Sequence, residues 1–91
     1  MAGKAASRIA RVPVYQQIRR DLIARIEKGE WRPGERIPKE LDLCREYGVA
    51  LGTLRRATDA LVADEILARR EGVGTFVKTF RWGGYWNQFM I

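Results

Sequence analysis

Apolar residues recur at helical spacing in the first third of the chain. Within residues 14–28 they stand three or four positions apart, which is typical of one face of an amphipathic helix. Pro13 precedes this run, where a proline at a helix start is tolerated, and Gly29 follows it, where glycine commonly ends a helix. The pattern predicts a first helix over residues 14–28, with its apolar face at Tyr15, Ile18, Leu22 and Ile26.

Residues 30–37 lack a helical pattern and are predicted to be a connector. The Pro33-Gly34 pair within them is a turn signal. Trp31 and Ile37 flank this turn, and we expect both to be core anchors.

Two short helical patterns follow, with only four residues between them. The first is predicted to start at Pro38, to run to Tyr47 and to be closed by Gly48. Its apolar side is formed by Leu41, Leu43, Cys44 and Tyr47. The second covers about residues 52–64. Its predicted buried stripe is Leu54, Ala57, Ala60 and Leu61. Two short helices joined in this way are the organisation of a helix-turn-helix.

After residue 65 the pattern changes from helical to strand-like. Residues 66–70 and 75–78 are short β-prone runs, and the gap between them contains Gly72 and Gly74, which favours a hairpin. Three helices followed by a β-hairpin predict a winged helix-turn-helix, a mainly α fold with a small β-hairpin. We expect this domain to occupy residues 13–78.

The composition is basic and lacks most side chains that carry catalysis. Lysine and arginine number 17 against 11 acidic residues, a net charge of +6. There is no histidine, and Cys44 and Ser7 are the only cysteine and serine. The usual zinc sites and a histidine-activated nucleophile are therefore excluded. We expect a binding module, not an enzyme, without metal or cofactor, and the charge makes nucleic acid the first partner to consider.

The chain carries no signal for a membrane or for secretion. Its longest apolar run, residues 60–63, is far shorter than the roughly 18 residues of a membrane span, and the N-terminus lacks the apolar region of a secretion signal. A single cysteine fits a reducing compartment. We expect a cytoplasmic protein with Cys44 in its core.

Both ends of the sequence differ from the predicted domain. Residues 1–12 contain three basic side chains and no acidic one, and are predicted to be a flexible basic arm. Six of the nine aromatic residues fall within residues 76–91. We expect residues 79–91 to be a linker or the start of a further effector-binding or dimerisation domain. A direct dimer interface made by these aromatic side chains is the alternative.

Five motifs occur between residues 14 and 77, namely VYQQI at 14–18, WRPGERIP at 31–38, YGV at 47–49, TLRRA at 53–57 and RREGVGTFV at 69–77. Their order and spacing resemble the DNA-binding domain of GntR-family transcription regulators. The resemblance implies a dimeric DNA-binding regulator, most often a repressor, controlled by a small effector that binds a C-terminal domain. The aromatic run after residue 76 points to the HutC-type branch of the family.

The resemblance also assigns roles to parts of the domain. It implies that the recognition helix, about residues 52–64, enters the major groove of double-stranded DNA and that the wing, residues 71–75, reaches the minor groove. A helix fits the major groove, where base edges carry a distinct pattern of donors and acceptors. Arg55 is the expected main contact to base or phosphate. The full set of expected DNA-binding residues is Lys39, Leu51, Gly52, Thr53, Arg55, Arg56, Arg70, Gly72, Val73 and Gly74.

Several positions depart from the family pattern. Leu41 and Leu51 stand where arginines usually contact DNA, and leucine cannot make bidentate bonds. Leu51 is instead able to pack on a thymine methyl group, which favours A·T pairs. Lys39 and Ala50 replace serine helix caps. Glu65 replaces a glycine after the recognition helix, so a different cap is expected there.

These departures keep a second hypothesis open. A winged-helix module that has lost specific DNA reading would use Leu41, Leu51 and the aromatic tail as an apolar docking surface for another protein. DNA binding would weaken steeply as salt rises, whereas apolar docking would not. Salt dependence therefore separates the two hypotheses.

Overall fold

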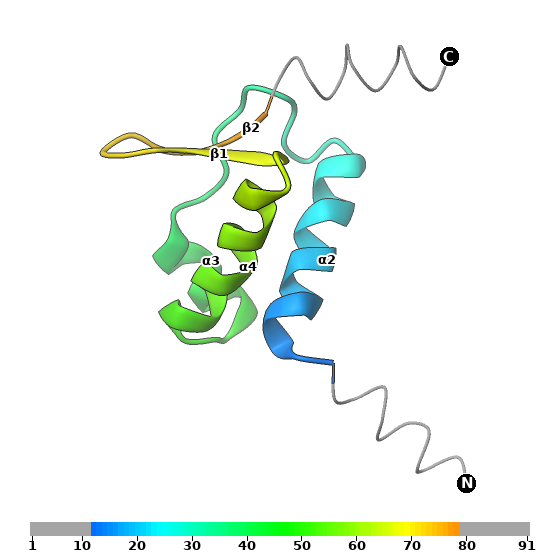
Figure 1. Cartoon of the computed structure of the whole chain (residues 1–91), viewed down its shortest axis with the longest axis vertical. Helices are drawn as coiled ribbons and strands as arrows, with labels where there is room; N and C mark the ends of the chain where they lie inside the picture. Colours follow the sequence, from blue (N-terminus) through cyan, green and yellow to red (C-terminus); the bar gives the residue numbers. More distant parts are fainter. Residues whose placement is uncertain (1–11, 79–91) are drawn as a thin grey trace, which may run out of the picture.

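The computed structural model describes residues 12–78 of the chain. The predicted tail of residues 79–91 and the predicted basic arm, apart from Val12, lie outside the described residues. In the described part, three helices precede a two-stranded hairpin, and Figure 1 shows the hairpin next to the end of α4. The elements are α2 (Val14–Glu27), α3 (Glu40–Tyr47), α4 (Leu51–Ala63), β1 (Leu67–Arg70) and β2 (Gly74–Val77).

Helix α2 forms as its apolar spacing predicts and buries Ile18, Leu22 and Ile26. Its end is fixed by a Schellman motif around Gly29, whose φ is +88°. The Gly29 amide donates to the Ile26 carbonyl, and the next amide, of Glu30, donates to the Arg25 carbonyl. Glycine adopts this left-handed conformation at little cost, which explains why the helix stops here.

Helix α3 begins later than predicted and buries a narrower face. Pro38 lies before the helix, because Lys39 is its extended N-cap and the first residue in the helix is Glu40. Leu41 was expected on the buried side, but 60% of it is exposed. This prediction was wrong because Leu41 precedes the buried Leu43 by two residues, about 200° around a helix.

Helix α4 is the centre of the domain and contacts α2, α3 and β1. Its buried stripe is Leu54, Ala57, Thr58 and Leu61. Ala60 was predicted to belong to this stripe but is only half-buried, whereas Thr58 is buried and was not predicted there.

The end of α4 does not use the different cap that was expected. Glu65 takes the left-handed conformation at φ +66°, and the amides of Glu65 and Ile66 donate to the carbonyls of Val62 and Leu61. A glycine-type Schellman motif therefore forms without glycine.

The hairpin is extended by the connector that precedes α3. Strands β1 and β2 are antiparallel, with Leu67 opposite Val77 and Arg70 opposite Gly74. On the other side of β2, the Ile37 amide donates to the Thr75 carbonyl and the Val77 amide donates to the Glu35 carbonyl. The connector thus pairs with β2, and this pairing ties the base of the wing to the start of α3.

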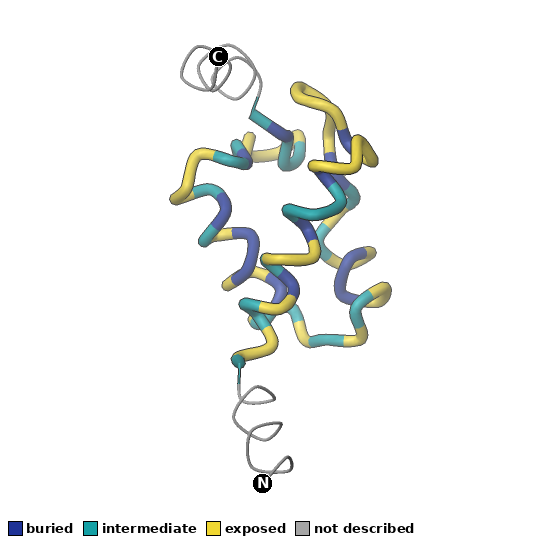
Figure 2. The backbone as a smooth tube through the Cα atoms, turned by 90° about the vertical axis from the view of Figure 1, so that its right-hand side faces the viewer, coloured by how far each residue is buried: buried dark blue, intermediate teal, exposed yellow. Residues whose placement is uncertain are grey.

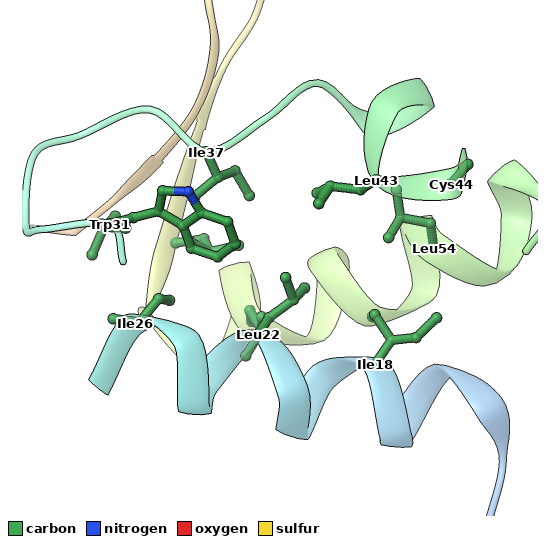
Figure 3. Packing of buried hydrophobic residues seen from close by; sticks show 12 residues of the cluster. Ile18, Leu22, Ile26, Trp31, Ile37, Leu43, Cys44 and Leu54 are labelled. Carbon is green, nitrogen blue, oxygen red and sulfur yellow. The ribbon is translucent and has the colours of Figure 1, made fainter. Parts of the chain in front are cut away.

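One apolar core joins all these elements. Figure 3 shows Ile18, Leu22 and Ile26 of α2 directed toward side chains from the other elements, with Leu43 lying close to Leu54. Trp31 and Ile37 are buried as predicted, and so is Cys44. In Figure 2 the buried positions face inward and the hairpin is largely exposed around its turn. Among residues 12–78, no helix is long and apolar enough to cross a membrane.

Candidate nucleic-acid interface

The first half of α4 presents a solvent-facing surface opposite its buried stripe. Gly52, Arg55 and Arg56 are exposed, and Leu51 and Thr53 are half-buried. Leu51 packs against the core, so only part of its side chain is available to a partner. The helix N-terminus carries the positive end of the helix dipole, which favours an anionic partner there.

Gly52 is a glycine that the fold itself does not require. A Cβ atom built on it meets no atom within 4 Å, and it lies in the first turn of α4 in ordinary helical conformation. Glycine is less favourable than alanine in a helix. Its missing side chain leaves the surface of α4 open to close approach at this point.

The two arginines of α4 are directed to different neighbours. The Arg55 Nε lies 3.0 Å from Oε1 of Glu40 in α3. The Arg56 guanidinium instead lies over the Tyr15 ring of α2, 4.3 Å from its centroid, a cation–π contact. The expected DNA-binding arginines therefore flank the exposed face of α4, with Arg55 on the α3 side and Arg56 on the α2 side.

The wing is held by an arginine from the connector. The Arg36 side chain donates from Nη1 to the Val73 carbonyl at 3.0 Å. A Cβ atom on Gly74 would lie 2.5 Å from Cδ of Arg36, so the absence of a side chain at Gly74 lets Arg36 lie along the wing. Val73 is 55% exposed at the tip, and Gly72 has a φ of +78°.

A groove of about 330 Å³ separates the wing from the start of α3. Its walls include the expected site residues Lys39, Arg70, Gly72, Val73 and Gly74. Lys39 and Arg70 are exposed, and within residues 12–78 neither forms an ion pair. Two available cations therefore face this groove.

Arg69 also lines the groove but has acidic partners. Its Nη1 lies 2.8 Å from Oδ1 of Asp59, and its Nη2 donates to the Thr58 hydroxyl at 3.0 Å. The same Nη2 is 3.6 Å from Oε2 of Glu40. Its contacts join β1 to α3 and α4.

A second polar cluster joins the end of α2 to α3. The Arg25 guanidinium lies over the Trp31 ring at 4.4 Å and forms ion pairs with Glu30 and Glu46 at 2.6 and 3.0 Å. The hydrogen bond to Glu30 contributes most to raising the pKa of Arg25, and the same bond lowers the pKa of Glu30.

The Tyr47 hydroxyl belongs to this cluster as both acceptor and donor. It accepts from Arg25 Nη1 at 2.8 Å and donates to Oδ2 of Asp21 at 2.5 Å. Burial, followed by the hydrogen bond to Asp21, raises the pKa of Tyr47 to about 12. These contacts give Arg25 a structural role between the end of α2 and α3.

Sequence reasoning missed two residues that organise this surface. The sequence patterns assigned no role to Glu40, and they predicted Tyr15 only as part of an apolar helix face. Glu40 meets Arg55 across fifteen positions of sequence and Arg69 across twenty-nine. Local spacing carries no signal for such contacts, which depend on how α3 packs on α4.

Comparison with known proteins agrees with this geometry. Residues 14–77 match the family described as "Bacterial regulatory proteins, gntR family". The histidine utilization repressor of Pseudomonas putida is 42% identical over 65 residues, which are 71% of this chain and 26% of the relative. The probable fructoselysine utilization operon transcriptional repressor of Escherichia coli (strain K12) is 39% identical over 75 residues, 82% of this chain and 31% of the relative. The chain therefore spans less than a third of the length of these relatives.

A solved structure supports the fold independently. The DNA-binding domain of AraR, in complex with operator ORE1, matches with a TM-score of 0.71 and 35% identity over 72% of this chain and 80% of that one. The winged helix-turn-helix predicted from the sequence is confirmed, and the relatives are transcription regulators, not enzymes. The family match covers most of the chain, and the chain belongs to the gntR family of bacterial regulatory proteins.

Proposed function

We propose that this chain is the DNA-binding domain of a sequence-specific transcription regulator, most often a repressor in its family. The observation that carries the proposal is that Glu40 stands between the two expected DNA-binding elements. It contacts Arg55 of α4 on one side and lines the groove beneath the wing on the other. The exposed start of α4 and the wing thus lie on either side of Glu40, beside a groove whose charged residues are Arg36, Lys39, Arg69, Arg70, Glu40 and Glu71.

The N-terminal half of α4 enters the major groove of double-stranded DNA in this proposal. Arg55 and Thr53 contact base edges or phosphates, and Gly52 allows the backbone to approach closely. Leu51 and Arg56 border this contact. The exposed positions of α4 support this orientation, since its opposite face is closed by the core.

The wing, residues 71–75, takes the adjacent minor groove. Gly72 and Gly74 carry no side chains, so the backbone of the wing is able to approach the DNA closely, and Val73 is exposed at its tip. Lys39 and Arg70, which have no acidic partner among residues 12–78, supply phosphate contacts at its base. Such contacts position a protein on DNA without reading sequence.

The functional unit is a homodimer in the cytoplasm that binds two half-sites with two-fold symmetry. Half-sites one helical turn apart, or a multiple of it, suit this arrangement. A small effector that binds a C-terminal domain controls the affinity. The repressor names of the two relatives and the small share of their length that matches this chain support this assignment.

Selection from random duplex DNA at near-physiological salt tests the proposed function. We expect enrichment of a defined site, bound by the full chain with an affinity that falls steeply as salt rises. The alternative, a protein-docking module, has Leu41 as its exposed leucine. Salt-insensitive capture of a protein, with no enriched DNA, would favour that alternative and contradict DNA reading.

A further inference from the structure

Glu40 connects the two halves of the candidate interface. It is the first residue of α3, and 26% of its side chain is exposed. Its two carboxylate oxygens face two arginines from different elements. Oε1 lies 3.0 Å from Arg55 Nε in α4, and Oε2 lies 3.6 Å from Arg69 Nη2 in β1.

The Arg69 side of this connection is firmly anchored. Arg69 also binds Asp59 at 2.8 Å and the hydroxyl of Thr58 at 3.0 Å, and Thr58 is 1% exposed in the core. The contacts therefore run from the buried Thr58 through Arg69 to Glu40. One oxygen of Glu40 thus lies 3.6 Å from an arginine that is anchored on the core, and the other meets an arginine that is 57% exposed.

The contact uses a specific part of the Arg55 guanidinium. The hydrogen bond to Glu40 uses Nε, and among residues 12–78 neither Nη1 nor Nη2 donates a hydrogen bond. These two groups are the fork that donates two parallel hydrogen bonds to guanine O6 and N7 or to a phosphate. Glu40 thus holds Arg55 through Nε, and the Nη1 and Nη2 groups of Arg55 stay available to a base or a phosphate.

Holding Arg55 in advance affects specific binding in particular. A free arginine loses side-chain entropy when it is fixed on a base, and a pre-organised one loses less. The carboxylate also repels phosphates wherever the protein binds DNA. One residue therefore favours the specific complex and opposes the non-specific one.

We propose that Glu40 is a specificity-determining positioning residue, which orients Arg55 for base reading and disfavours binding to DNA of arbitrary sequence. The proposal rests on the proposed function, since it assigns Glu40 a role within the same interface. Glu40 touches no base itself and acts through Arg55. Replacing Glu40 is therefore expected to lower the affinity for the specific site and to raise the affinity for DNA of arbitrary sequence.

The test compares Glu40→Met and Glu40→Gln in the full chain, each measured on a selected duplex and on a scrambled one. Both variants lose one negative charge, so both are expected to bind the scrambled duplex about twofold more tightly. Met cannot accept a hydrogen bond from Arg55, and its affinity for the selected duplex is expected to fall about tenfold. Gln keeps an acceptor oxygen and is expected to lose less.

Asp42→Asn provides a matched control for charge and for the helix dipole. Asp42 is the other acidic residue in the first turn of α3, and its partner is Arg45, 3.2 Å away. We expect this variant to leave the ratio of specific to non-specific affinity unchanged. An equal fall of that ratio in Asp42→Asn and Glu40→Met would overturn the proposal, because loss of charge alone would then explain it.

A double-mutant cycle shows whether Glu40 acts through Arg55. In an Arg55→Ala background, Glu40→Met is expected to cause no further loss of specific affinity. A full tenfold loss in that background would overturn the proposal.

A second readout needs no DNA. The Arg55 Nε–H resonance in the NMR spectrum of the free chain is expected to be shifted and protected, and Glu40→Met is expected to remove both effects. An unchanged resonance contradicts the positioning role. If the wild-type chain selects no DNA site while this resonance responds as expected, the proposed function has failed and the specificity role fails with it, but the Glu40–Arg55 contact stands.

Discussion

The Arg69 guanidinium donates a hydrogen bond to the buried hydroxyl of Thr58, 3.0 Å away, while the neighbouring Arg70 has no ion pair among residues 12–78. Both residues line the groove beside the wing, but only Arg69 has acidic partners. The contacts of Arg69 stabilise the fold, whereas Arg70 is available to bind a partner.

Alanine substitution of these two arginines is expected to separate stability from DNA affinity. Arg69→Ala removes contacts to Thr58, Asp59 and Glu40, and should lower the free energy of unfolding by about 1 kcal/mol. Arg70→Ala should leave that free energy unchanged and reduce the slope of log affinity against log salt by about 1. Denaturant titration and binding at several salt concentrations measure the two quantities. The opposite pattern would mean that the two roles are reversed.

Gly74 is expected to tolerate a side chain poorly because Arg36 occupies the space. Gly74→Ala places Cβ 2.5 Å from Arg36 Cδ, at a φ of +148°, and should destabilise the domain by about 1–3 kcal/mol. Arg36→Ala should relieve part of this loss, so the two substitutions should be non-additive in denaturant titrations.

Gly72→Ala is the matched control for this prediction. Gly72 also has a positive φ, but a Cβ atom there meets no atom within 4 Å. Backbone strain alone should then act, and Arg36→Ala should not relieve it. Strict additivity at Gly74 would show that Arg36 is not the obstacle.

Gly52→Ala is expected to stabilise the free protein and weaken its binding to DNA. Alanine favours the helix by about 0.5 kcal/mol at such a position, and the new methyl group meets no atom within 4 Å in the part of the chain that the structure describes. The methyl group would, however, occupy the surface at which DNA approaches α4. Thermal unfolding and affinity for a selected duplex should therefore change in opposite senses. Unchanged affinity would remove Gly52 from the interface.

The stability of the domain is expected to fall between pH 10 and 12 through Tyr47. Its pKa is raised from the ordinary value of 10.0 to about 12 in the fold, so the folded state favours the protonated hydroxyl. The resulting stability is complete below the unfolded pKa and disappears as the pH rises through the folded one. Tyr47→Phe has no such proton and should show a shallower loss over this interval in denaturant titrations. Parallel curves for the two proteins would contradict the assignment.

Local patterns predicted the fold well because they are properties of single elements. The spacing of Ile18, Leu22 and Ile26 defined α2, and glycines marked its end and the end of α3. Leu41 was misplaced because an eight-residue helix samples each face only about twice. The Schellman end at Glu65 was missed because glycine usually takes the left-handed position of this motif, and here a glutamate takes it.

The candidate site was less predictable from sequence. Arg55 and the wing glycines stood in recognisable motifs, but the partners of the arginines did not. Glu40, Tyr15 and Thr58 meet arginines from other elements only after α2, α3 and β1 have packed on α4. Such long-range pairs depend on the relative placement of the elements, and no periodicity of the sequence encodes it.

The most direct test of DNA reading by α4 and the wing is an amide chemical-shift titration of the isotope-labelled chain with a selected duplex. The largest shifts are expected at residues 51–56 and 71–75 and at Lys39, with little change at Glu27 and Lys28, which are exposed at the C-terminal end of α2 and do not line the groove beside the wing. A scrambled duplex should give smaller shifts that disappear as salt is raised. Shifts centred on Glu27 and Lys28, or equal responses to both duplexes, would contradict sequence reading by this surface.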